Sequence, residues 1–126
     1  MTRPPISTPR GAVPALSLVV GIVLADSAIV TLALPAILRE LGAEVSSVAW
    51  VLIAFNLVLA LAAVPGARVL VRGNAATACA VAIVVFAGAS AACALAGSLG
   101  VLIAARVVQA AGGAVVIVGC LELLVA

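Results

Sequence analysis

Four long apolar runs, separated by short breaks rich in polar residues, glycine or proline, account for most of the chain. They extend over residues 15–38, 48–66, 75–97 and 99–124. An α-helix rises about 1.5 Å per residue, so about 20 residues cross a hydrocarbon core roughly 30 Å thick. The pattern therefore predicts an all-α integral membrane protein with about four transmembrane helices over residues 15–126.

The first fourteen residues differ from the rest of the chain. They hold two arginines and four prolines, a composition typical of a disordered tail: Arg3, Arg10, Pro4, Pro5, Pro9 and Pro14. A basic start followed by an apolar run also suggests a secretory signal peptide. That alternative is disfavoured because the run over 15–38 exceeds a signal core of about 7–15 residues and has Asp26 near its middle.

Composition supports the membrane assignment and excludes several other classes. Hydrophobic residues make up 67% of the chain and charged residues 8%, with a mean hydropathy of +1.52. A net charge of +2 without a basic cluster does not suit a nucleic-acid partner. The chain has no histidine, no Ser/His/Asp or Cys/His set, no metal-ligand cluster and no Gly-rich phosphate loop, so we expect no enzyme, metal or cofactor chemistry. Three cysteines in apolar stretches are interpreted as small buried hydrophobes: Cys79, Cys93 and Cys120.

The distribution of arginine predicts the orientation. With a cytoplasmic N-terminus, the tail arginines together with Arg68 and Arg72 lie inside, and Arg39 alone lies outside. Cytoplasmic loops of membrane proteins carry the excess of basic residues. We therefore expect a multi-pass protein of the cell (plasma or inner) membrane whose N-terminus is cytoplasmic.

Two charged residues fall well inside the apolar runs. Asp26 lies near the middle of the first run, and Arg106 lies about one third along the fourth. Their expected depths differ by four or five residues, about 6–7 Å, which an arginine side chain can cover. Ionisable groups within a membrane are costly and usually face a partner or a cavity. We therefore predict that Asp26 and Arg106 meet, either as a proton or substrate site or as an ion pair that only fixes helix packing.

Three further polar residues accompany this pair. Gln109 follows Arg106 by three residues and shares its helix face, so it belongs to the same candidate pathway. Asn56 lies mid-way along the second run and is a candidate for the pathway or for an interhelical hydrogen bond. Glu122 lies near the end of the fourth run, where a carboxylate can reach headgroup water.

Small residues recur at helical spacing, which allows helix backbones to approach closely in lipid. Gly88, Ala92 and Ala96 lie on one face of the third helix, and Ala105, Gln109 and Gly113 lie on one face of the fourth. Both faces predict close helix packing.

Several motifs at consistent spacing resemble the opening of a major facilitator superfamily transporter, in particular the fourteen-helix drug:proton antiporter branch. Residues 25–35 are similar to its first-helix pattern L-D-x-T-I-V-N-V-A-L-P, and residues 102–109 resemble its fourth-helix pattern L-x-x-x-R-x-x-Q-G. Weaker similarity covers the second helix near Trp50 and the end of the third near Cys93. The resemblance extends over residues 21–121.

This resemblance implies an efflux-type drug:proton antiporter. Such transporters consist of three-helix inverted repeats, so the chain would be an N-terminal fragment that does not transport without the remainder of the transporter. The family's gating loop reads G-R-L-A-D-R-x-G-R-R, and here Arg68 and Arg72 persist, with Gly73 at the variable position. Val71 replaces the gating aspartate, Asn74 replaces the second glycine, and Ala75 and Ala76 replace the trailing basic pair. The loop is therefore degenerate.

Two other interpretations remain open. A complete four-helix small multidrug transporter acting as a dimer fits the length, but it would be expected to use glutamate and more aromatic residues, and Arg106 would repel a cation. A non-transporting membrane subunit, in which the polar residues bind a partner helix, is opposed only by the motif matches. The small-molecule substrate stays unidentified.

Overall fold

The computed structural model describes residues 11–125, and these form four α-helices: α1 (Ala12–Leu41), α2 (Val45–Arg72), α3 (Ala75–Ala94) and α4 (Leu99–Val125). All four are long and apolar enough to cross a membrane, and no strand occurs among the described residues. The predicted all-α, multi-pass architecture is therefore confirmed. Most of the predicted tail, residues 1–10, lies outside the described residues, and α1 begins at Ala12.

The second helix is longer than predicted. The predicted second helix ends at Gly66, after Pro65, but α2 continues to Arg72. An internal proline removes a single backbone donor and does not by itself end a helix that neighbours support. Gly66 and Leu70 are buried, and a Cβ on Gly66 would lie 3.3 Å from the Val115 side chain of α4. Packing against α4 therefore stabilises the last two turns.

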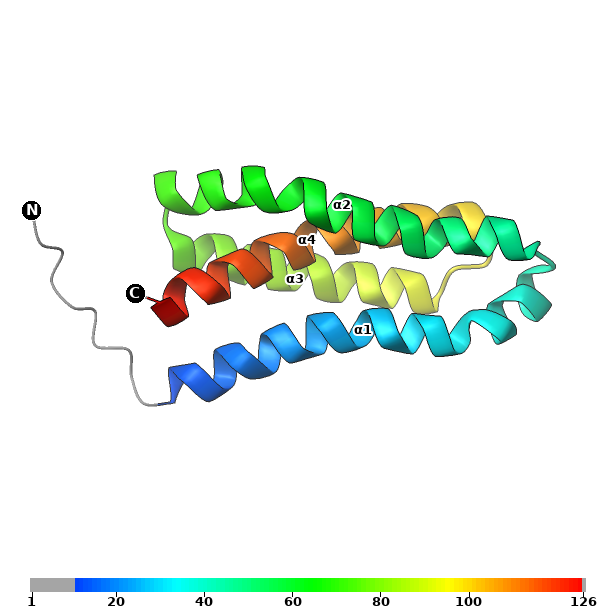
Figure 1. Cartoon of the computed structure of the whole chain (residues 1–126), viewed down its shortest axis with the longest axis horizontal. Coiled ribbons are helices and arrows are strands. Elements are labelled where there is room, and N and C mark those ends of the chain that lie inside the picture. The colour runs from blue at the N-terminus through cyan, green and yellow to red at the C-terminus, as the bar shows by residue number, and fades with distance from the viewer. Residues whose placement is uncertain (1–10, 126) are drawn as a thin grey trace, which may run out of the picture.

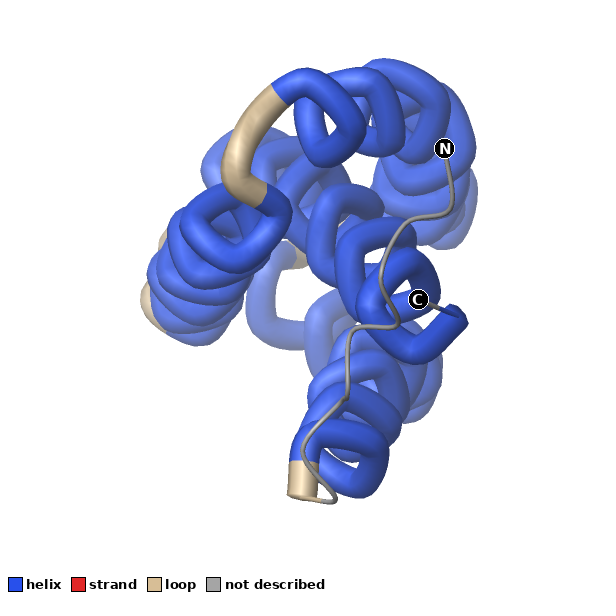
Figure 2. The backbone as a smooth tube through the Cα atoms, turned by 90° about the vertical axis from the view of Figure 1, so that its left-hand side faces the viewer, coloured by secondary structure: helices blue, strands red, loops and turns tan. Residues whose placement is uncertain are grey.

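Consecutive helices are antiparallel, and α4 lies in the middle of the bundle. It packs against α1, α2 and α3 (Figure 1; Figure 2). The start of α1, the α2–α3 turn and the end of α4 lie at one end of the bundle, and the other two turns lie at the opposite end (Figure 1). The fourth helix is therefore the scaffold on which the other described helices are placed.

Each turn has its own local cause. Gly42 ends α1 in the left-handed conformation at φ 58°, which glycine adopts without strain. Asn74 caps α3, because its side chain accepts hydrogen bonds from the backbone N–H groups of Ala76 at 3.1 Å and Thr77 at 3.3 Å. Ser98 caps α4 by accepting from Val101 N–H at 3.4 Å.

Glycines of α4 allow its neighbours to approach closely. A Cβ on Gly112 would lie 3.1 Å from the carbonyl oxygen of Ala82, so the backbones of α3 and α4 are nearly in contact there. A Cβ on Gly113 would lie 3.2 Å from the Val23 side chain of α1. The predicted close packing around Gly113 is therefore present.

The corresponding prediction for the third helix is wrong. A Cβ on Gly88 would meet no atom within 4 Å, and Ala92 is exposed. The buried face of α3 instead consists of Cys79, Ala82, Phe86 and Ala89. Alanine is so common here that spacing alone does not identify the contact face, whereas the large Phe86 side chain does.

Candidate functional site

The buried polar side chains of the bundle form one connected chain. Arg106 donates from Nη1 to the Asp26 carboxylate, in an ion pair between α4 and α1, and to Oε1 of Gln109 at 2.5 Å. Gln109 donates from Nε2 to Oγ of Ser90 on α3 at 2.6 Å. The Cys93 thiol donates to Oε1 of Gln109, with a sulfur–oxygen distance of 3.7 Å. We call these five residues the polar chain.

The polar chain is buried at its centre and partly exposed at its end on α1. Arg106 and Gln109 are fully buried, whereas the Asp26 side chain is 22% exposed. Charges in an apolar interior are tolerated when they are paired and hydrogen-bonded. The pairing of Asp26 with Arg106 that the sequence predicts is therefore confirmed as a contact.

An aromatic ring completes the surroundings of the arginine. The Phe55 ring of α2 lies against the guanidinium, with 3.9 Å between the ring centroid and Cζ. Two nitrogens of Arg106, Nε and Nη2, have no hydrogen-bond partner among the described residues. The negative face of an aromatic ring attracts such a cation, so Phe55 partly replaces the missing acceptors. Through Phe55, α2 also contributes to the site.

The helix packing explains why these side chains meet. Arg106, Gln109 and Gly113 follow one another at helical spacing on α4, and Gly113 brings α1 close to this face through Val23. Asp26 lies three residues after Val23 and so projects from nearly the same side of α1. The absence of a side chain at Gly113 thus positions the carboxylate of Asp26 beside Arg106.

The remaining predicted site residues lie elsewhere. Asn56 is exposed on α2 and donates to the carbonyl of its own helix at Leu52, at 2.9 Å, so it lies outside the polar chain and makes no interhelical hydrogen bond among the described residues. Arg68 and Arg72 are exposed on the last turns of α2, and Gly73 ends that helix rather than forming part of a longer loop. Glu122 is exposed near the end of α4, away from the polar chain.

Three members of the site were not identified from the sequence. Cys93 is interpreted from the sequence as a buried hydrophobe, and Ser90 and Phe55 are not among the predicted site residues. Their spacing carries a usable signal, because Phe86, Ser90 and Cys93 recur at intervals of four and three residues on one face of α3. A helical face that combines hydroxyl and thiol groups is a reasonable place to seek partners for Gln109.

A cleft extends from the polar chain between α1 and α3. It has a volume of about 350 Å³, is lined by Val19, Ile22, Ile83 and Phe86 among others, and has Ser90 as its hydrogen-bonding side chain. The polar chain therefore connects this apolar cleft with the Asp26 carboxylate.

The polar chain offers a carboxylate, a guanidinium, an amide, a hydroxyl and a thiol as groups for binding. Among residues 11–125 no group of three or more His, Cys, Asp or Glu side chains could hold a metal ion. Asp26 is the carboxylic acid of the polar chain, and Arg106 is its cationic partner.

The chain matches no protein-family model, no curated protein and no solved structure.

Proposed function

We propose that this chain is part of a secondary active transporter of the major facilitator type, an efflux-type drug:proton antiporter, in which Asp26 carries the exchanged proton. The observation that supports the proposal most strongly is the ion pair of Asp26 with the fully buried Arg106, in helices able to span a membrane. Ionisable residues at such depth commonly belong to ion or substrate pathways.

The partial exposure of Asp26 fits a proton-exchange role. Its side chain is 22% exposed while its partner is fully buried, so the acid is the more accessible member of the pair. Protonation would neutralise the acid and weaken the ion pair between α1 and α4. A conformational change between the two helices could therefore be coupled to the proton.

A non-transporting membrane subunit is the second candidate, and the burial of Arg106 favours it. A guanidinium that pairs with Asp26 and Gln109 and stacks on Phe55 also suits a fixed packing element. The dimeric four-helix transporter is less well supported, because Arg106 already neutralises the acid that would have to attract a cationic substrate.

Ethidium efflux from cells that lack their own multidrug pumps tests the proposal. The cells would express the complete open reading frame that encodes this chain. We expect efflux with the native sequence, a substantial part of it with Asp26→Glu, and none with Asp26→Asn. Glu122→Gln, which changes an exposed acid near the end of α4, is the matched control and should preserve efflux. Unchanged efflux in Asp26→Asn would overturn the role of Asp26.

A further inference from the structure

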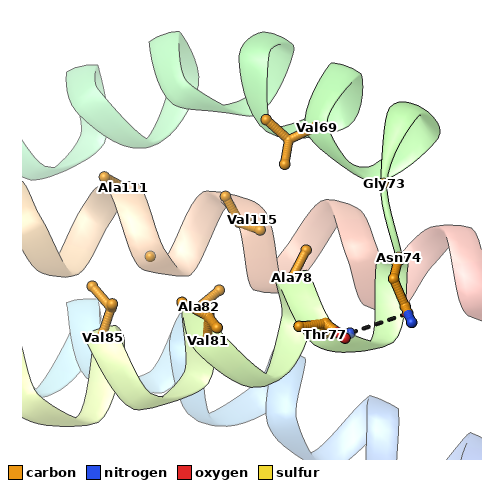
Figure 3. Close-up of a pocket in the computed structure, with 11 residues that line it drawn as sticks. Val69, Gly73, Asn74, Thr77, Ala78, Val81, Ala82, Val85, Ala111 and Val115 are labelled. Atoms are coloured by element: carbon orange, nitrogen blue, oxygen red, sulfur yellow. Dashed lines mark hydrogen bonds between the residues drawn. The ribbon is translucent and has the colours of Figure 1, made fainter.

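An apolar groove lies between α2 and α3, at the end of the bundle opposite the α3–α4 turn. Its floor is formed by Ala111, Gly112 and Val115 of α4, and Val69 of α2 faces Val81 of α3 across it (Figure 3). The two walls diverge from their shared turn at Gly73 and Asn74 (Figure 3). The groove has a volume of about 550 Å³ and is open along its length.

The length of the groove matches the depth of one leaflet of the hydrocarbon core. Along α3 it extends from Asn74 to Val85, which is about 16 Å at 1.5 Å per residue. One leaflet of a hydrocarbon core roughly 30 Å thick is about 15 Å deep. Its polar residues, Asn74 and Thr77, lie at the turn, and valine and alanine line the rest. A hydrocarbon chain that enters from the turn would therefore contact apolar side chains throughout.

Two arginines lie beside the polar end of this groove. Arg68 and Arg72 are exposed one turn apart on α2, next in sequence to the groove residues Val69 and Gly73. With Ala67 and Val71 they line a shallow depression. Neither makes an ion pair among residues 11–125, and the sequence contains no acidic residue from Val45 to Leu121. The two guanidinium groups therefore have no ion-pair partner among the described residues, and Glu122, exposed near the end of α4, is the acidic residue at this end of the bundle.

We propose that the groove binds one anionic phospholipid, with an acyl chain between α2 and α3 and the phosphate beside Arg68 and Arg72. Guanidinium groups bind phosphate through charge-assisted hydrogen bonds, and basic residues beside an apolar surface select anionic lipids. Phosphatidylglycerol is therefore preferred over phosphatidylcholine.

Electron paramagnetic resonance of spin-labelled lipids tests this site in nanodiscs that contain the purified full chain. The motionally restricted fraction of spin-labelled phosphatidylglycerol is compared with that of phosphatidylcholine. We expect phosphatidylglycerol to be retained more strongly, by about fivefold for each arginine. The exchange of both arginines, Arg68→Gln with Arg72→Gln, should remove this preference. Arg39→Gln, at the opposite end of the bundle, should preserve it.

The groove itself is tested with a matched pair of tryptophan substitutions. Val81→Trp places a bulky ring in the groove, whereas Val84→Trp places it on the exposed surface of α3 outside the groove, so both positions tolerate the change. We expect Val81→Trp to lower the restricted fraction of phosphatidylglycerol at least threefold and Val84→Trp to leave it unchanged. Equal retention of the two lipids, a preference that persists without the arginines, or equal effects of the two tryptophans would each overturn the proposal.

Discussion

Arg106 and Asp26, 80 residues apart in the sequence, form an ion pair between α4 and α1, and the arginine is fully buried. The pair joins the central helix of the bundle to a helix that otherwise exposes most of its surface. Because each charge is satisfied mainly by the other, the removal of one leaves the other unpaired in an apolar environment. This relationship underlies the first prediction.

Neutralising one of the two charges should destabilise the bundle much more than neutralising both. We expect Arg106→Met or Asp26→Leu alone to lower the free energy of unfolding by about 3 kcal/mol, because each leaves an uncompensated charge. The combination Asp26→Leu with Arg106→Met should recover most of this loss, since a well-packed apolar pair replaces a buried ion pair at little cost. Unfolding in mixed micelles, followed by circular dichroism, measures these changes. A double variant as unstable as either single one would contradict this interpretation.

The hydrogen bond between Gln109 and Ser90 should contribute modestly. Ser90→Ala is expected to cost about 0.6 kcal/mol, the average for interhelical hydrogen bonds in membranes. Gln109→Leu should cost more, about 1–3 kcal/mol, because it also removes an acceptor of the buried Arg106. A double-mutant cycle of Ser90→Ala and Gln109→Leu isolates the coupling between them. Zero coupling would show that this contact contributes nothing to stability.

Substitutions at Gly119 and Cys79 test the packing of the α3–α4 interface, because the second substitution should reverse the effect of the first. A Cβ at this position would overlap the Cys79 sulfur, so we expect Gly119→Ala to destabilise by about 1–3 kcal/mol through overpacking. Adding Cys79→Ala removes that sulfur and should restore most of the lost stability. Gly88→Ala is the control, because its Cβ would meet no atom within 4 Å. There the gain in helix propensity should stabilise slightly, by about 0.5–1 kcal/mol. Melting temperatures in detergent measure the stability of all three variants.

The orientation predicted from the arginines can be tested by reporter insertion. A reporter active only in the cytoplasm should be active at the Gly73–Asn74 turn and inactive at the Gly42–Ala43 turn. The two turns lie at opposite ends of the bundle (Figure 1), so one experiment examines both sides of the membrane. The reverse pattern would place the N-terminus outside.

The sequence predicted the helices well because lipid imposes a simple rule of length and apolarity. It also predicted the Asp26–Arg106 contact, since a charge within a membrane needs a partner and few partners existed. It was less informative wherever the outcome depended on which face of a helix is buried. The Asn56 side chain donates its hydrogen bond to a carbonyl of its own helix, which the spacing of residues in the sequence does not predict.

The errors at the end of α2 and on α3 share the same physical origin. Pro65 marks the end of a helix on local grounds, but burial of Leu70 against α4 keeps the helix intact to Arg72. On α3, alanine is so abundant that its spacing does not identify the face in contact with α4. That face includes Phe86 and Cys79, which are buried in the structure. Tertiary packing therefore decided the features that local sequence did not.

Proton flux in proteoliposomes tests the central claim most directly, because it separates folding from proton exchange. The product of the complete open reading frame is reconstituted with the pH indicator pyranine inside, and ethidium is added under an imposed pH gradient. We predict an ethidium-dependent proton flux for the native protein and none for the stable Asp26→Leu, Arg106→Met double variant. A flux of native size in that double variant would show that the Asp26–Arg106 pair only stabilises the bundle.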